Sequence, residues 1–242
     1  MLSALAQRDR IPELMDDPGL DPIAHRRALA GLARINGLSR STAVLWSPIR
    51  ELAAKQPERP LRILDVACGS GDVPVGLALK AERAGLRLEI AACDLSPTAV
   101  QAGEQAATAA RIGDQIRFFT HDVIRDPLPG GYDVITCSLF LHHLSEDDAV
   151  TVLRRMKDAA GAMVLVNDLE RSRFNYLAVW LVCHALTRSP VVHFDGPASV
   201  RSAFTPEEAL ALASRAGLSG AMVARRWPCR WLLRRTVGDA RG

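Results

Sequence analysis

The chain has 242 residues, of which 48% are hydrophobic and 24% charged, and its formal net charge is +3. This length suits one domain with an elaboration or two small domains, and the composition excludes a disordered or low-complexity protein. The small net charge gives no argument for a nucleic-acid partner. Five single cysteines without a CxxC pair argue against a disulfide framework and a structural zinc site, so we expect a cytoplasmic protein.

Neither a secretory signal nor a membrane span is expected. The N-terminal residues carry charges of both signs. The longest apolar run, residues 176–186, contains His184 and falls short of the ~20 residues that cross a bilayer.

Helical and strand-like patterns follow one another along the chain. Residues 22–56 have a helical pattern with a break at 35–41, and from Leu61 short apolar runs alternate with amphipathic stretches. The expected strands are 61–67, 86–94, 115–122, 132–138 and 161–169, the expected helices are 73–85, 96–111, 145–160 and 205–217, and residues 220–227 and 230–236 are expected to form a closing hairpin. This alternation predicts an α/β fold: an open Rossmann-like, mostly parallel seven-stranded sheet with helices on both faces and ligand-binding loops at the carboxyl edge.

Residues 171–203 interrupt the alternation. A structureless loop of that length is uncommon in a compact domain, so we interpret the segment as an inserted helix plus loop that forms a cap over the carboxyl edge. The predicted organisation is an N-terminal helical segment at 1–58, a core at 59–170 and 204–237, and the cap at 171–203.

The sequence ILDVACGSGD at residues 63–72 ends an expected strand in a glycine-rich turn. Such a turn brings backbone N–H groups close to a ligand at a helix N-terminus. A dinucleotide site requires G-x-G-x-x-G, but no third glycine follows Gly69 and Gly71, and Asp72 would place a negative charge where a pyrophosphate should lie. The turn therefore favours a cationic ligand.

Carboxylates follow the expected strands. Asp65 and Asp72 can face an ammonium group, although Asp65 can also cap the turn. Asp94 ends the second strand, where an acid accepts hydrogen bonds from two ribose hydroxyls; a helix-entry residue is the alternative. Asp122 can accept from an adenine amine or be a solvated turn residue. Together these residues describe a pocket for S-adenosylmethionine.

Four segments resemble, in order, the motifs of the class I S-adenosylmethionine-dependent methyltransferases: LDVACGSGD at 64–72, CDLSPTAV at 93–100, HDV at 121–123 and YDVITCSLFLHHL at 132–144. The resemblance covers about residues 60–170 by motif and continues to about 237 by element order. It implies S-adenosylmethionine as cofactor, no metal, and cofactor contacts from Arg40, Asp65, Ala67, Gly69, Gly71, Asp72, Asp94, Leu95, Asp122, Val123 and Cys137. Arg40 is the candidate for the methionine carboxylate, with an exposed arginine as the alternative.

Three histidines are candidate bases. Methyl transfer needs alignment and exclusion of water, and a hydroxyl acceptor also benefits from a base. His142 and His143 follow the fourth strand, where the methyl group should lie, and His193 belongs to the cap. For each of them a structural role is the alternative.

The substrate candidates are aromatic and cationic. They are Phe140, Tyr176 and Phe194 with Arg173 and Arg201, and packing of the cap is the alternative for the aromatic residues. An apolar or aromatic acceptor suits them better than a protein or a nucleic acid. Residues 137–140, CSLF, also differ from the Asn/Asp-Pro-Pro-aromatic tetrad of enzymes that methylate nucleobase amines.

The C-terminal segment 224–236 contains five arginines and two tryptophans. A solvated edge hairpin accounts for them, and weak contact with an anionic membrane surface is the alternative. We expect a monomer or homodimer, similar to bacterial polyketide- and quinone-type methyltransferases, that O-methylates a small phenolic or polyketide-derived acceptor. The alternatives are C-methylation of a quinol-type ring and a non-catalytic cofactor-binding protein.

Overall fold

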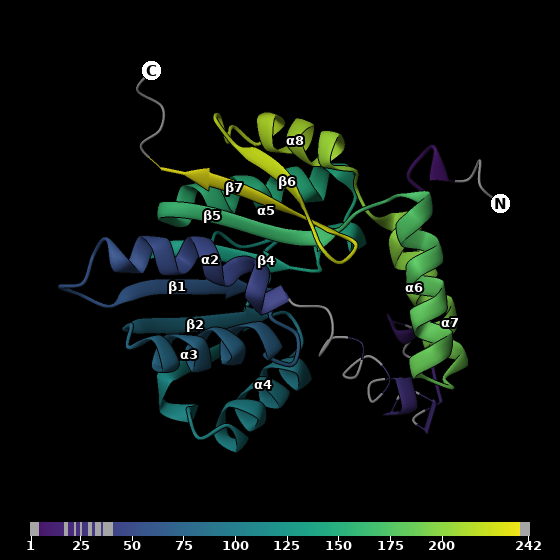
Figure 1. The fold of residues 1–242 in the computed structure, drawn as a ribbon, viewed down its shortest axis with the longest axis horizontal. Helices are drawn as coiled ribbons and strands as arrows, with labels where there is room; N and C mark the ends of the chain where they lie inside the picture. Colours follow the sequence, from purple (N-terminus) through teal and green to yellow (C-terminus); the bar gives the residue numbers. More distant parts are fainter. Residues whose placement is uncertain are drawn as a thin grey trace.

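A seven-stranded sheet forms the centre of the molecule (Figure 1). The computed structural model describes residues 5–16, 19–21, 23–24, 26–28, 31, 35 and 41–237. The strands are β1 (Leu61–Val66), β2 (Leu88–Asp94), β3 (Ile116–Thr120), β4 (Tyr132–Ser138), β5 (Ala160–Leu169), β6 (Met222–Arg226) and β7 (Arg230–Thr236), in the order β3-β2-β1-β4-β5-β7-β6. Strands β1 to β5 are parallel, and β7 pairs antiparallel with both β5 and β6. The predicted mostly parallel sheet with a closing hairpin is confirmed.

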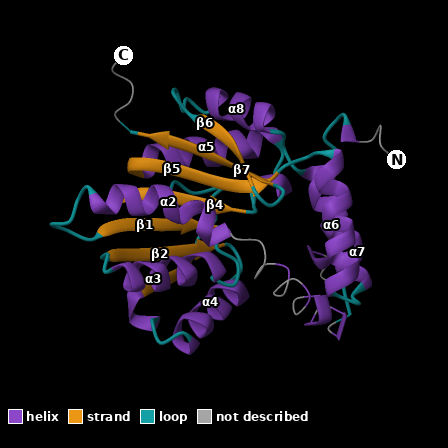
Figure 2. Ribbon diagram, in the orientation of Figure 1, coloured by secondary structure: helices purple, strands orange, loops and turns teal. Residues whose placement is uncertain are grey.

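Helices cover both faces of this sheet (Figure 2). One face carries α2 (Ser41–Ala54), α3 (Asp72–Ala84) and α4 (Pro97–Ala109), and the other carries α5 (Glu146–Ala159) and α8 (Pro206–Arg215). Because successive strand residues point to opposite faces, Ile63 enters the core with Leu45 and Leu77 while its neighbour Leu64 enters the core with Leu153. Short 3-10 turns lie at η2 (Leu14–Asp16), η3 (Gly113–Gln115) and η4 (Leu141–His143).

The cap consists of two helices, α6 (Arg173–Leu186) and α7 (Pro190–Ser202), which lie side by side at the carboxyl edge of the sheet (Figure 1). The sequence predicted one helix plus a loop in this segment. The structure has a second helix instead of the loop, and α7 contains Gly196 and Pro197. A Cβ on Gly196 would lie 2.5 Å from Cys183 Sγ, so this glycine allows α7 to pack closely against α6.

Residues 5–16 form an N-terminal strap that crosses from the sheet edge to α7. Arg8 donates hydrogen bonds to the carbonyl oxygens of Ser202, His142 and Leu144 at 2.5, 2.9 and 2.7 Å. The backbone N–H of Leu14 donates to Asp195 Oδ1 at 2.7 Å. The strap therefore holds the turn after β4 and the cap together.

The C-terminal hairpin contains buried as well as exposed side chains. Trp231 is fully buried and donates from Nε1 to the Phe204 carbonyl at 3.1 Å, whereas Trp227 is exposed. Arg225 is exposed, and its Nε lies 2.8 Å from Glu170 Oε1. This exposed ion pair is typical of a solvated edge. Contact of this hairpin with a membrane surface stays a prediction. No helix among the described residues has the length and apolar character needed to cross a bilayer.

Candidate active site

The glycine-rich turn between β1 and α3 has an unusual backbone. Ala67, Gly69 and Gly71 have φ values of 54°, 52° and 81°, in the left-handed region that favours glycine. A Cβ on Gly71 would lie 2.9 Å from the Gly103 Cα and 3.2 Å from the Phe118 ring. Side chains are thus excluded at Gly71, because the turn packs directly against α4 and β3.

Asp94 at the end of β2 fixes the turn from the neighbouring strand. Its Oδ2 accepts from the Gly69 N–H at 2.9 Å, and its Oδ1 accepts from the Ser96 N–H at 3.0 Å. Each carboxylate oxygen has a further lone pair for a ligand hydroxyl. The helix-entry role and the proposed ribose-binding role are therefore compatible in one residue.

Asp65 lies beneath the same turn and is almost completely buried. Burial raises its pKa to about 7, although the hydrogen bond from Thr136 Oγ1 at 2.6 Å lowers it; the nearby Asp94 charge raises it further. A cation bound at the turn would favour the ionised carboxylate. The site thus fits a ligand with an ammonium or sulfonium group.

The remaining predicted cofactor residues differ in accessibility. Asp122 Oδ1 accepts from the N–H groups of Ile124 and Arg125 at 2.9 and 3.0 Å, which is a turn-capping arrangement. Its contact with adenine stays a prediction. Asp72 and Leu95 are exposed, Val123 is buried and Cys137 is enclosed in the core, while Arg40 lies outside the described residues.

The turn after β4 contains a buried histidine–aspartate pair. His142 Nδ1 lies 2.7 Å from Asp168 Oδ1, and the His142 backbone N–H donates to Asp168 Oδ2 at 3.1 Å. Burial alone would lower the pKa of His142, but the Asp168 carboxylate outweighs it and the pKa lies above 6.5. This contact places the imidazole proton on Nδ1 and leaves Nε2 as a proton acceptor.

Glu13 of the N-terminal strap completes this region. Its Oε1 lies 3.9 Å from His142 Nε2 and 4.0 Å from His143 Nδ1, and it accepts a hydrogen bond from the Ser199 hydroxyl. The pKa of His143 is lowered by burial and by the adjacent His142. The ligand atoms of Glu13, His142 and His143 lie within 4.8 Å of one another, so they could hold a divalent cation.

A cavity of about 430 Å³ lies between the carboxyl edge, the cap and the C-terminal hairpin. Its walls are mainly apolar, and polar side chains enter from several elements. The lining residues are Glu13, Ile35, Leu139, His142, His143, Leu169, Ala178, Val179, Val182, Cys183, Gly196, Ser199, Trp227, Pro228, Cys229 and Arg230. His142 and His143 are therefore brought to a cavity with the volume of a small-molecule site.

The other predicted acceptor residues occupy different positions. Phe140 packs against the core, Arg201 pairs with Asp9, and none of Phe140, Arg173, Tyr176, Phe194 and Arg201 is among the described residues that line the cavity. His193 Nε2 lies 2.9 Å from the Thr187 carbonyl oxygen, and its ring stacks on His184 with centroids 4.0 Å apart. The structure does not bring His193 to the cavity.

The pattern search missed Glu13, Asp168 and Arg230, all of which contribute to the histidine pair or the cavity. Asp168 carries the signal that identified Asp94, an acid at the end of a parallel strand. Glu13 and Arg230 have no comparable signal, because their positions depend on contacts between segments distant in sequence.

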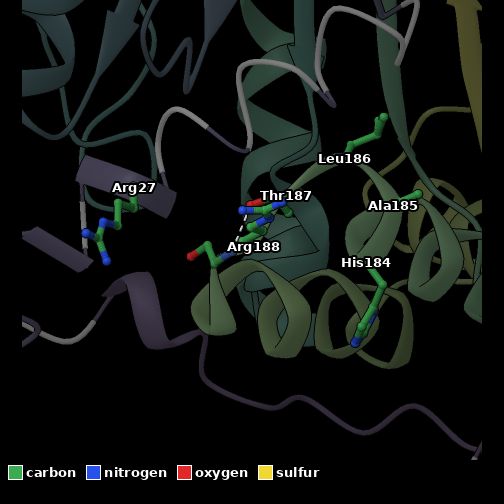
Figure 3. A pocket seen from close by; sticks show the side chains of 7 residues that line it. Arg27, His184, Ala185, Leu186, Thr187 and Arg188 are labelled. Carbon is green, nitrogen blue, oxygen red and sulfur yellow. Dashed lines mark hydrogen bonds between the residues drawn. The ribbon is translucent and has the colours of Figure 1, made fainter.

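A second pocket, of about 530 Å³, lies at the C-terminal end of α6. Figure 3 shows Arg27 opposite Thr187 and Arg188, with His184 farther along α6. Among the described residues, none lines both this pocket and the first cavity. The second pocket therefore lies apart from the His142–Asp168 pair.

Comparison with known proteins agrees with this geometry. Residues 63–160 match a family described as a methyltransferase domain. A 3-hydroxy-5-methyl-1-naphthoate 3-O-methyltransferase from Streptomyces sahachiroi is 33% identical over 110 residues, which cover 45% of this chain and 30% of the relative. A ubiquinone biosynthesis O-methyltransferase from Burkholderia vietnamiensis is 28% identical over 116 residues, which cover 48% of this chain and 47% of the relative.

The fold is also similar to solved methyltransferase structures. The S-adenosylmethionine-dependent methyltransferase SibL in its apo form superposes with a TM-score of 0.65 at 20% identity, covering 96% of this chain and 64% of that chain. The chain shares the fold of these methyltransferases, and residues 63–160 are similar to the methyltransferase-domain family. The matched segments span about a third to a half of the length of the two curated relatives.

Proposed function

We propose that this chain is an O-methyltransferase that uses S-adenosylmethionine and acts on a small phenolic or polyketide-derived acceptor. One observation carries the proposal: the buried His142–Asp168 pair opens onto an apolar cavity beside the end of β4. A base held next to a mainly apolar cavity of small-molecule size suits an acceptor that must lose a hydroxyl proton. The two curated relatives, which are named as O-methyltransferases, support the same chemistry.

The cofactor half of the site is assigned to the residues of the glycine-rich turn. Asp94 would bind the ribose hydroxyls, Asp65 would face the ammonium group, and Asp122 would bind the adenine amine. The buried Asp65 carboxyl beneath the turn and the Asp94 carboxylate beside it support a cationic ligand at this edge. Asp72 and Arg40 are retained as proposed contacts for the amino-acid end.

The histidine pair supplies the proton acceptor. Bound S-adenosylmethionine would supply a methyl group that is already activated on a sulfonium, so the protein's main tasks are alignment and proton transfer. His142 Nε2 would accept the proton of the acceptor hydroxyl group as its oxygen is methylated. The resulting imidazolium donates from Nδ1 to Asp168. The products are a methyl ether and S-adenosylhomocysteine.

Two other functions use parts of the same geometry. C-methylation of a quinol-type ring needs the same cavity with a ring carbon in place of the oxygen. A cofactor-binding protein without catalysis needs only the glycine-rich turn, and it gives no account of the buried base or of the cavity.

Calorimetry and product analysis test the proposal together. Purified protein is titrated with S-adenosylmethionine, S-adenosylhomocysteine and NADH, then incubated with S-adenosylmethionine and a set of naphthols and hydroxybenzoates. We expect the first two ligands to bind and a methyl ether to form, identified by mass spectrometry and NMR. A methyl group on a ring carbon would favour the first alternative, binding without any product would favour the second, and binding of NADH alone would refute the cofactor assignment.

A further inference from the structure

Arg230 is a buried cation whose Nη1 has no hydrogen-bond partner among the described residues. It is the first residue of β7, lies beside Leu169 of β5 in the sheet, and lines the cavity with that residue. Its side chain is only 4% exposed, yet its guanidinium forms no hydrogen bond or ion pair within 4.0 Å with any residue in the described part of the chain. A guanidinium in this position calls for an explanation, because buried charges are normally paired.

Arg171 shows what a structural arginine at the same depth looks like. It is also 4% exposed, but its Nη1 and Nη2 donate to Glu208 at 2.7 and 2.5 Å, and its Nη1 donates to the Ala203 carbonyl at 2.6 Å. Arg171 therefore fastens the cap to α8 with its charge compensated. Arg230 has the same burial and lacks that compensation.

The carboxylates around Arg230 are committed to other groups. Asp168 accepts from the His142 ring, from the His142 N–H and from the Leu169 N–H. Glu170 pairs with Arg225, and Glu13 accepts from Ser199. Burial lowers the pKa of Arg230 to about 10, partly offset by Asp168, so the side chain stays charged at neutral pH. Its charge is available to a ligand in the cavity.

We propose that Arg230 binds a carboxylate of the acceptor, so that the acceptor is an aromatic acid whose hydroxyl group lies close to its carboxyl group. The inference rests on the proposed function and names the substrate class for the same cavity. Arg230 and His142 line one small cavity, so a single ring can place its hydroxyl at His142 Nε2 while its carboxylate reaches the guanidinium. The planar guanidinium matches a carboxylate with two parallel hydrogen bonds, and the charge that the protein leaves unpaired is neutralised on binding.

A matched series of acceptors tests the assignment. The probes are a hydroxynaphthoic acid with hydroxyl and carboxyl groups on adjacent carbons, the corresponding carboxamide, and the naphthol that lacks the carboxyl group. For the wild type, kcat/KM for the acid should exceed the values for both neutral compounds by about 30-fold or more, the scale expected when a buried charged pair is completed or left incomplete. Equal values for all three compounds would overturn the proposal.

Variants separate recognition from folding. In Arg230→Gln the preference for the acid over the two neutral compounds should disappear, and Arg230→Lys should keep part of the preference. Arg226→Gln is the matched control, because Arg226 is exposed and lies opposite Arg230 in the same hairpin. Retention of the full preference in Arg230→Gln would exclude carboxylate binding by this residue. A loss of the naphthol reaction with the same melting temperature would assign Arg230 another role.

A binding measurement keeps this test independent of turnover. Calorimetric titration of the acid into protein saturated with S-adenosylhomocysteine should give binding in the wild type and in Arg226→Gln, and binding at least about tenfold weaker in Arg230→Gln. If the acid binds in this pattern but no compound is methylated, the proposed function fails and the Arg230 site stands. If the naphthol is methylated but the acid neither binds nor reacts better, the Arg230 proposal fails and the proposed function stands.

Discussion

The two halves of the site are held in place by different kinds of contact. At the cofactor edge, hydrogen bonds to the backbone dominate: Asp94 receives the Gly69 N–H, and Cys68 donates its N–H to the Cys93 carbonyl at 3.0 Å. At the acceptor cavity, side chains from the strap, the β4 turn, the cap and the hairpin meet, and contacts between side chains, such as His142 with Asp168 and Ser199 with Glu13, help to position them.

This difference predicts that the two halves respond separately to mutation. A backbone cradle recognises any molecule with the right shape and tolerates change in most side chains, so it suits a cofactor that does not vary. A cavity built from side chains changes its specificity when one residue changes. Substitutions in one half should therefore leave ligand binding in the other half intact.

The largest effect is expected at the histidine–aspartate pair, His142 and Asp168. His142→Gln removes the proton acceptor and should reduce kcat by about 1,000-fold, within the range for loss of a general base. Calorimetry should give the wild-type affinity for S-adenosylmethionine, because the cofactor edge is unchanged. A variant with reduced cofactor affinity would break the proposed separation of the two halves.

The pH profile of the wild type checks the same residue. His142 must be neutral to act as a base, so the rate should rise with pH through a pKa above 6.5. In Asp168→Asn the partner that raises this pKa is lost. The rising part of the pH–rate profile should then move to lower pH, and the maximum rate should fall. An unchanged rising part would exclude His142 as the titrating group.

The second effect is expected at the cofactor edge. Asp94→Ala removes both the support for the Gly69 turn and the proposed ribose contact, and should weaken S-adenosylmethionine binding by about 100-fold, as for the loss of two hydrogen bonds to a charged group. Asp114→Ala, an exposed carboxylate in η3, serves as the control. Binding of the acceptor acid on its own should be the same in both variants.

A third, smaller effect concerns Glu13, His142 and His143. Zn²⁺ at tens of micromolar should occupy these three ligands and slow methyl transfer by about tenfold, competitively with the acceptor and not with S-adenosylmethionine. Glu13→Gln should be less sensitive. Dialysis against a chelator should leave the rate unchanged, and a loss of activity that added metal restores would show that a metal takes part in the reaction.

The smallest effect is a pH dependence of cofactor affinity. Asp65 has a pKa of about 7, and only its ionised form attracts an ammonium group. Binding should therefore release a proton, and affinity should rise about fivefold between pH 6 and pH 8. In Asp65→Asn the affinity for S-adenosylmethionine should no longer rise between pH 6 and pH 8, as measured beside the wild type. An identical pH dependence in both proteins would show that Asp65 does not face the cation.

Local patterns were sufficient for the cofactor edge. Gly69, Gly71 and Asp94 could be placed because each follows directly on a strand, and strand ends meet at one edge of a parallel sheet. Arg230 was assigned to a solvated face, because composition does not show which arginine of a basic segment is buried. Only one helix was predicted within residues 171–203, because the close packing of Gly196 in α7 against Cys183 in α6 is a tertiary contact.

The N-terminal strap has a consequence for the order of folding. Arg8 contacts Ser202 and Leu14 contacts Asp195, which are separated by 194 and 181 positions, whereas Gly69 and Asp94 are separated by 25. Contacts between distant positions close slowly, because a long loop must be ordered before they form. A refolding chain should therefore regain S-adenosylmethionine binding before it regains acceptor binding, with the strap docking last.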